Sequence, residues 1–247
     1  MHHGSFRYLI KHELAMGISR FYKKIWIWVY VAIILILAGT ALTIWGGNDK
    51  FNPTYILFST YMFPFLVFGI SVKTLKREWE KGTYGWWLTL PYSRFRLLAA
   101  KAVSALIQVI AGYSLFFITV LLLGIYSFII HGEGLSPIRE LFATELQYAG
   151  ILIGVSPFML ALGLLATVVR RSVMKPLTPM IWIAFGLFGN IFSWVSSFNS
   201  LSESGNSNGL ISGSLPDWIW LCIIPVWMIA ALLFAATVHV CNKYLQV

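Results

Sequence analysis

The residues able to take part in chemistry gather in one stretch, 73–101, which holds nine charged side chains in 29 positions. Its first part reads Glu78-Trp79-Glu80-Lys81-Gly82-Thr83. Acids beside bases suit recognition of another charged surface, and a glycine at this point is typical of a helix end. A basic loop resting on anionic lipid headgroups is the alternative, but it explains the lysines and arginines and leaves the acids unexplained. The stretch therefore predicts a contact with another charged surface through complementary charges.

Motifs for catalysis or cofactor binding are absent from the sequence. The dipeptide Gly-Lys does not occur, so there is no phosphate-binding loop for ATP. There is also no His-Glu-x-x-His motif and no cysteine pair with the spacing of metal ligands. We therefore expect a protein that is not an enzyme and that binds no cofactor or metal itself.

Long apolar stretches make up most of the chain, which is 58% hydrophobic and only 11% charged. A helix needs roughly 20 apolar residues to cross a bilayer. The sequence predicts an all-α membrane protein with six transmembrane helices, at 25–45, 54–72, 102–130, 147–169, 177–199 and 218–238. Pro64 should kink or break the second span, and 138–146 should form either a short separate helix or an extension of the fourth.

The basic residues predict the orientation of these spans. With both termini in the cytoplasm, sixteen of the 18 Lys and Arg residues fall inside, and only Lys50 and Arg139 fall outside. This asymmetry follows the positive-inside rule. Most acids then lie outside: Asp49, Glu133, Glu140, Glu145, Glu203 and Asp217. The net charge of +9 therefore reflects topology, and no nucleic-acid partner is expected.

The chain divides into an N-terminal segment, 1–24, and a transmembrane domain, 25–247, that contains the loop 73–101. Within the first segment, apolar residues fall on one side of a helix over 5–22, which predicts either an amphipathic helix in the cytoplasmic interface or an ordinary juxtamembrane anchor. Those apolar residues are Phe6, Ile10, Leu14, Ile18 and Phe21.

Few polar residues lie inside the predicted spans, and none of them is Asp, Glu, Lys or Arg. This argues against proton-coupled transport, which usually places such groups within the bilayer. Ser104, Gln108 and Asn190 are the notable polar positions. They either pack helix against helix or line a path for a transported molecule.

The loop 73–101 resembles the cytoplasmic loop of permease subunits from type-2 ATP-binding-cassette exporters. In that family a Glu, a Gly-Thr pair four residues later, a Leu, a Pro-x-Ser-Arg and a Lys recur between the second and third spans. The matching residues here are Glu78, Gly82-Thr83, Leu88, Pro91-Tyr92-Ser93-Arg94 and Lys101. The motif covers about 24 residues, and the six-span layout extends the likeness over the whole chain.

The resemblance implies a transmembrane subunit that works with a separate cytoplasmic ATPase, which would bind ATP and Mg²⁺. A second copy of the chain, or a related permease, would complete the assembly in the plasma membrane of a bacterium. The cargo would be an amphipathic peptide, an antibiotic or another hydrophobic compound. Residues implied to couple the two subunits are Glu78, Glu80, Gly82, Thr83, Pro91 and Arg94, with Arg170 and Arg171 in a smaller second contact.

Two other functions stay open on the sequence alone. One is a stand-alone secondary transporter, which the lack of intramembrane charges and of an inverted repeat disfavours. The other is a membrane anchor or sensor subunit that transports nothing. Co-purification with a soluble ATPase separates the exporter from both.

Overall fold

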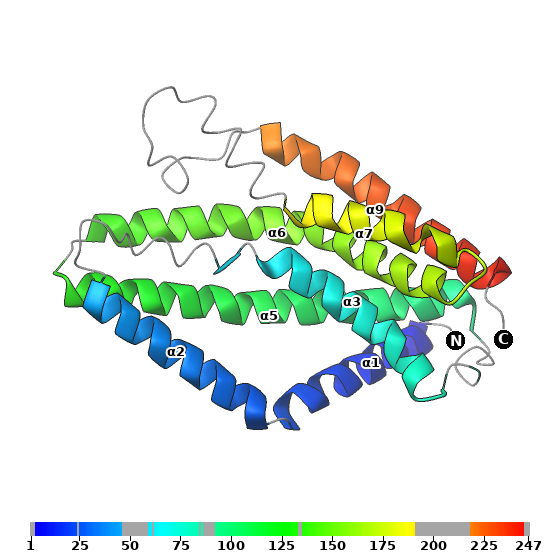
Figure 1. Cartoon of the computed structure of the whole chain (residues 1–247), viewed down its shortest axis with the longest axis horizontal. Helices are drawn as coiled ribbons and strands as arrows, with labels where there is room; N and C mark the ends of the chain where they lie inside the picture. Colours follow the sequence, from blue (N-terminus) through cyan, green and yellow to red (C-terminus); the bar gives the residue numbers. More distant parts are fainter. Residues whose placement is uncertain are drawn as a thin grey trace.

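The computed structural model describes residues 3–23, 25–45, 59–60, 62–83, 85, 92–132, 135–190 and 218–244, and over these residues the chain is built of helices (Figure 1). In chain order these are α1 (His3–Lys23), α2 (Ile25–Trp45), α3 (Phe63–Glu80), α5 (Arg94–Ile130), α6 (Leu135–Arg170), the 3₁₀ turn η2 (Lys175–Leu177), α7 (Thr178–Gly189) and α9 (Trp218–Lys243). The prediction of an all-α protein is confirmed for this part of the chain.

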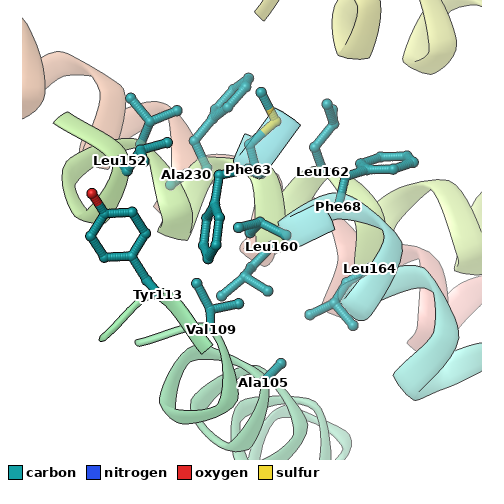
Figure 2. Close-up of a cluster of buried hydrophobic side chains, with 14 of the residues drawn as sticks. Phe63, Phe68, Ala105, Val109, Tyr113, Leu152, Leu160, Leu162, Leu164 and Ala230 are labelled. Carbon is teal, nitrogen blue, oxygen red and sulfur yellow. The ribbon is translucent and has the colours of Figure 1, made fainter. Parts of the chain in front are cut away.

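The core of the bundle lies along α6. This helix packs against α3, α5, α7 and α9, and most of its apolar stretch is buried. Figure 2 shows part of this core, where Leu152, Leu160 and Leu164 meet Phe63 of α3 and Val109 of α5. The apolar stretches of α5 and α9 are mostly exposed instead. Exposed apolar surface of this extent suits contact with lipid.

Three helices among the described residues are long and apolar enough to cross a membrane: Arg94–Ile130, Ile138–Arg170 and Trp220–Lys243. They correspond to the predicted third, fourth and sixth spans. The first predicted span, 25–45, coincides with α2, whose apolar portion, Trp28–Ile44, is shorter. Residues 54–58 of the second span, 191–199 of the fifth and the loop 200–217 lie outside the described part. The count of six and the side on which the termini lie stay predictions.

α3 begins at Phe63 with Pro64 in its first turn, so the predicted break at this proline is confirmed as a helix start. The helix then continues to Glu80 and carries the first part of the 73–101 stretch as an unbroken extension of the span. Ser93 caps α5, where its Oγ accepts a hydrogen bond from the backbone N–H of Arg96 at 3.4 Å. Residues 138–146 are part of α6, which makes them an extension of the fourth span.

Two charged residues just outside the predicted spans are buried in the bundle, which the sequence did not indicate. Lys101 and Glu145 were placed just outside the third and fourth spans, Glu145 among the outside acids, yet both are fully buried within α5 and α6. An apolar window stops at the first charged residue, whereas burial here comes from neighbouring helices. The predicted spans themselves hold no charged residue, but the interior of the bundle extends beyond their bounds and includes both side chains.

One end of the molecule gathers several segments that are distant in sequence. The start of α1, the end of α3, the start of α5, the end of α9 and the turn between α6 and α7 lie together there (Figure 1). From this end α1 packs against α5 and slants away from it, and α2 then returns toward the far end of α5 (Figure 1). We call this the loop end of the bundle.

Candidate functional site

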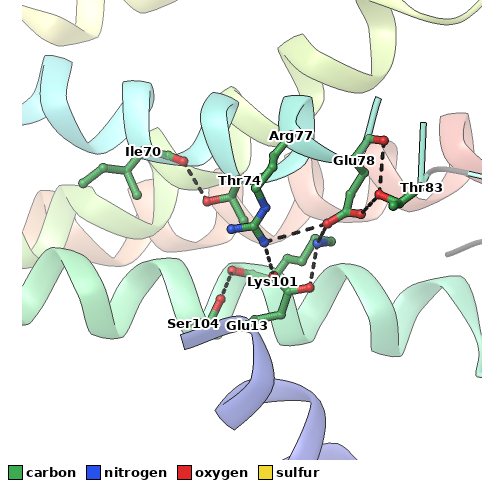
Figure 3. A network of polar contacts seen from close by, with 8 residues as sticks. All are labelled: Glu13, Ile70, Thr74, Arg77, Glu78, Thr83, Lys101 and Ser104. Atoms are coloured by element: carbon green, nitrogen blue, oxygen red, sulfur yellow. Dashed lines mark hydrogen bonds and ion pairs between the residues drawn. The ribbon is translucent and has the colours of Figure 1, made fainter. Parts of the chain in front are cut away.

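A fully buried lysine organises the loop end. The ammonium of Lys101, in the second turn of α5, lies 2.7 Å from Oε1 of Glu13 and 2.9 Å from Oε1 of Glu78 (Figure 3). Glu13 belongs to α1 and Glu78 to α3, and each residue is only 8% exposed. A buried ammonium is tolerated only where carboxylates and hydrogen bonds compensate its lost hydration. Lys101 therefore ties three helices together.

Arg77 completes the charge balance. Its Nη2 lies 2.9 Å from Oε2 of Glu13 and 3.8 Å from Oε1 of Glu78. Two acids thus meet two bases, and Glu13 bridges both cations. We call Glu13, Arg77, Glu78 and Lys101 the ion-pair network. The two carboxylates balance the two cations, so the network is neutral overall and can stay buried. A buried charge without its partner would be strongly destabilising.

The end of α3 folds back onto the network through a glycine turn. Gly82 adopts φ +67°, which confirms the predicted left-handed helix end. The backbone N–H of Gly82 donates to the carbonyl of Trp79 at 3.2 Å, and that of Thr83 donates to the carbonyl of Glu78 at 3.0 Å. These two bonds form a Schellman motif. They place the hydroxyl of Thr83 so that it donates to Oε2 of Glu78 at 2.6 Å.

Burial works against the ionised form of Glu78, but its neighbours outweigh that effect. The charge of Lys101, hydrogen bonds from Thr83 and Lys101, and the charge of Arg77 together lower the pKa of Glu78 below its ordinary value of 4.5. A carboxylate held by cations and donors is stabilised in this way. Glu78 is thus an anion at neutral pH, as the charge balance of the network requires.

The lowered pKa of Glu78 predicts how acid affects the fold. A depressed folded-state pKa gives stability that is present above the unfolded value of 4.5 and is lost as the pH falls through the folded value. We therefore expect the melting-temperature gap between the parent and Glu78→Gln in detergent to be constant above that pH and to narrow below it. If the difference in melting temperature between the two proteins does not change below that pH, ionised Glu78 does not stabilise the fold.

The other residues of the predicted coupling set take different positions. Glu80 is exposed and pairs with Lys76 at 2.9 Å, and Gly82 is exposed beside it. The guanidinium of Arg94 donates to the backbone carbonyl of Cys241, which ties the start of α5 to the end of α9. Pro91 lies outside the described residues. Coupling by all these residues stays a prediction.

Arg170 and Arg171 end α6 and are exposed at the loop end. Arg170 lines an open recess of about 460 Å³ with Lys175, Pro176, Thr178 and Pro179.

A family comparison decides the identity of the chain. The family model described as ABC-2 family transporter protein matches residues 19–190, well over half of the sequence. The chain belongs to the ABC-2 transporter family. No curated protein and no solved structure gives a significant match. Family membership and the apolar helices make this a multi-pass integral membrane protein, the membrane component of a transporter.

In this ABC-2 protein the predicted path-lining residues are not brought together. Ser104 is fully buried and its hydroxyl donates to the carbonyl of Lys101 at 3.0 Å. Gln108 faces Gly17 of α1, where an added Cβ would lie 2.6 Å from the amide nitrogen of Gln108. Asn190, at the end of α7, donates to the carbonyl of Gly186 of its own helix. Gln108 therefore packs against α1, Ser104 bonds within its own helix, and a path-lining role for these residues stays a prediction.

Sequence reasoning missed Glu13 and Arg77, which join Lys101 and Glu78 in this ABC-2 protein. One signal was present for Glu13. At about 100° per residue it lies roughly 20° from Phe6, at the edge of the apolar face of α1. It is also the only acid in the first 24 residues. A single acid at the margin of a buried face indicates a buried cationic partner, although it does not say which one.

Proposed function

We propose that this chain is the permease subunit of an ATP-driven exporter in which a separate cytoplasmic ATPase binds and hydrolyses ATP with Mg²⁺. The observation that carries the proposal is the ion-pair network, which fastens the α3 extension of the 73–101 stretch to both α1 and α5. A loop that only connects two spans does not need a fully buried lysine. A loop that receives force from a partner does need a rigid attachment.

The two sides of the α3 extension would have different tasks. On the exposed side, Glu80, Lys81 and Gly82 form a surface that a partner can contact. On the buried side, Glu78 is held by Lys101 and Thr83 within the chain. In this proposal Glu80 and Lys81 meet the ATPase, whereas Glu78 acts as a positioning residue. The role expected for Glu78 from the family resemblance, facing basic residues of the partner, is therefore revised.

Displacement of the loop would be passed on to α5. This helix has 37 residues and, at 1.5 Å per residue, is about 55 Å long, so it reaches beyond both faces of a bilayer core. α1 would move with it, because Glu13 shares both cations of the network. A second contact at Arg170 and Arg171 would hold the ATPase at the same end of the bundle.

The cargo class rests on the resemblance and on the apolar character of the bundle. An amphipathic peptide, an antibiotic or another hydrophobic compound would suit a pathway between apolar helices. The pathway would form with a second copy of the chain or a related permease in a bacterial plasma membrane. The lack of charged residues in the predicted spans was one argument against a stand-alone secondary transporter. Because Glu145 is buried in the bundle, that argument no longer holds. Family membership now opposes that alternative instead.

Co-purification tests the two-subunit proposal. The chain is expressed together with a candidate ATP-binding-cassette ATPase from the same organism and captured through a tag on the chain alone. We expect the ATPase to be retained and ATP hydrolysis to appear only in the complex. Gly82→Val should strain the turn at φ +67° by about 1–2 kcal/mol and weaken retention roughly tenfold.

Gly112→Val is the matched control, because Gly112 is an exposed helical glycine with no atom within 4 Å of an added Cβ. It should leave retention of the ATPase unchanged. Specific ATP hydrolysis by the isolated chain, or equal retention of the ATPase by Gly82→Val and the parent, would overturn the proposal.

A further inference from the structure

A second buried charged residue lies apart from the ion-pair network. Glu145 of α6 is fully buried, and the hydroxyl of Tyr113 on α5 donates to its Oε1 at 3.1 Å. Its other oxygen, Oε2, has no hydrogen-bond partner among the described residues. Native proteins rarely leave a buried carboxylate oxygen unpaired. This oxygen therefore calls for an explanation that the packing of α5 and α6 does not supply.

The surroundings of Glu145 are apolar. Tyr113 packs edge-on against Phe63 of α3, with ring centroids 4.8 Å apart (Figure 2). On the same face of α6, Leu141, Ala149 and Leu152 are buried within the core. The described residues provide no enclosed group of His, Cys, Asp or Glu that could hold a metal with it.

Among the described residues, no Lys, Arg or His forms an ion pair with Glu145. The sequence has no Asp, Glu, Lys or Arg in 25–45, 63–72, 102–130 or 218–238, the stretches of α2, α3, α5 and α9 that can pack at this depth. On α6 itself the nearest charged residues, Arg139 and Glu140, are exposed. The titratable groups at this level are the phenols of Tyr113 on α5 and Tyr148 on α6. Neither can supply a positive charge.

The protonation state of the Glu145 carboxyl follows from comparing the free-energy costs of burying its ionised and its neutral form. A carboxylate without a cation in an apolar interior costs far more than proteins tolerate, and such groups take up a proton instead. A neutral carboxyl with one unpaired oxygen costs only about 1–3 kcal/mol. The Tyr113 hydroxyl can donate to the carbonyl oxygen of the acid, which leaves Oε2 to carry the proton.

We propose that Glu145 is a proton-binding site of the bundle, which holds a proton while α5 and α6 are packed and releases it only when their separation admits water. The ligand is a proton because the site is closed and offers one carboxyl and one phenol. This site is distinct from the ion-pair network and does not depend on the ATPase. It predicts that acid conditions favour the packed arrangement of α5 and α6.

Infrared spectroscopy of the full chain in lipid nanodiscs tests the proposal directly. A protonated carboxylic acid gives a C=O stretching band that a carboxylate lacks. We expect this band in the parent at neutral pH and its loss in Glu145→Gln. In Tyr113→Phe the band should move to higher frequency, because the hydrogen bond to Oε1 is removed. Glu140→Gln, an exposed acid on the same helix, should leave the band unchanged.

The absence of this band from the parent at neutral pH would overturn the proposal, and so would its persistence in Glu145→Gln. An ionised Glu145 would point to an organic cation as its ligand instead. If Glu145→Gln does not fold, the band shift in Tyr113→Phe still decides the assignment. An unshifted band there would assign the proton to another carboxyl.

Discussion

Replacing Lys101 with Met is expected to destabilise the bundle by about 3–5 kcal/mol, the usual cost of removing one partner from a buried ion pair. Met keeps an unbranched chain but removes the ammonium that contacts Glu13 and Glu78. Two carboxylates then share the single cation Arg77. We expect α1 to detach from α5, since Lys101 is the α5 residue to which Glu13 binds. Equilibrium unfolding in mixed micelles measures the loss.

Lys76→Met is the matched control. Lys76 lies on the exposed side of α3 and pairs with Glu80 one turn away. Pairs of this kind contribute about 0.3–0.5 kcal/mol. A double variant, Lys101→Met with Glu78→Gln, restores neutrality with Glu13 and Arg77 alone. It should lose less stability than Lys101→Met by itself. Similar effects of Lys101→Met and Lys76→Met would mean that the network does not hold the three helices.

Local signals allowed the ends of the helices at this site to be predicted from the sequence. Gly82 ends α3 as expected, and Ser93 caps α5 from the position directly before the helix, where serine is favoured. Such ends depend on residues a few positions apart, because capping bonds close within one turn. The helical character of Lys73 to Glu80 was predictable for the same reason.

The partners within the network could not be predicted in this way. Lys101 and Glu13 are separated by 88 positions, and no periodic pattern links them. The family resemblance implied that Glu78 contacts another protein, whereas the structure buries it between helices. Its burial depends on how α1 and α5 cross, which is a property of the assembled bundle. Arg77 could not be singled out from the sequence, because other basic residues lie near it in the loop.

The positions of Lys101 and Glu145 show a second limit of sequence reasoning. Hydropathy reports whether a segment can face lipid, so it excludes a charged residue from a span. Both residues are instead shielded by other helices, Lys101 by α1 and α3 and Glu145 by α5. A charge at the edge of an apolar stretch is therefore better treated as a candidate buried group than as a boundary.

The tight contact between α3 and α6 at Gly163 should be the other point where a small substitution has a large effect on stability. An added Cβ at Gly163 would lie 2.7 Å from Cβ of Ser71, 2.9 Å from its Oγ and 3.0 Å from the carbonyl oxygen of Phe68. Ser71 cannot turn away freely, because its hydroxyl donates to the carbonyl of Leu160 at 2.6 Å. The backbone carbonyl of Phe68 cannot yield without moving α3.

We therefore expect Gly163→Ala to destabilise the bundle by about 1–3 kcal/mol, the usual cost of overpacking a core. Gly69→Ala is the control, because Gly69 lies on the same helix as Ser71 and an added Cβ meets no atom within 4 Å. Alanine there should stabilise α3 by roughly 0.5–1 kcal/mol. Unfolding in mixed micelles compares the two variants.

The same pair of variants also tests whether α3 carries force from the ATPase. A shift of α3 away from α6 moves Glu78 relative to Lys101, because both the packing contact and the network lie on this one helix. Gly163→Ala should then lower transport-coupled ATP hydrolysis in the assembled complex, while Gly69→Ala should not. A destabilised Gly163→Ala that keeps full coupling would mean that α3 stabilises the bundle without transmitting movement, and that α5 and α1 receive it by another route.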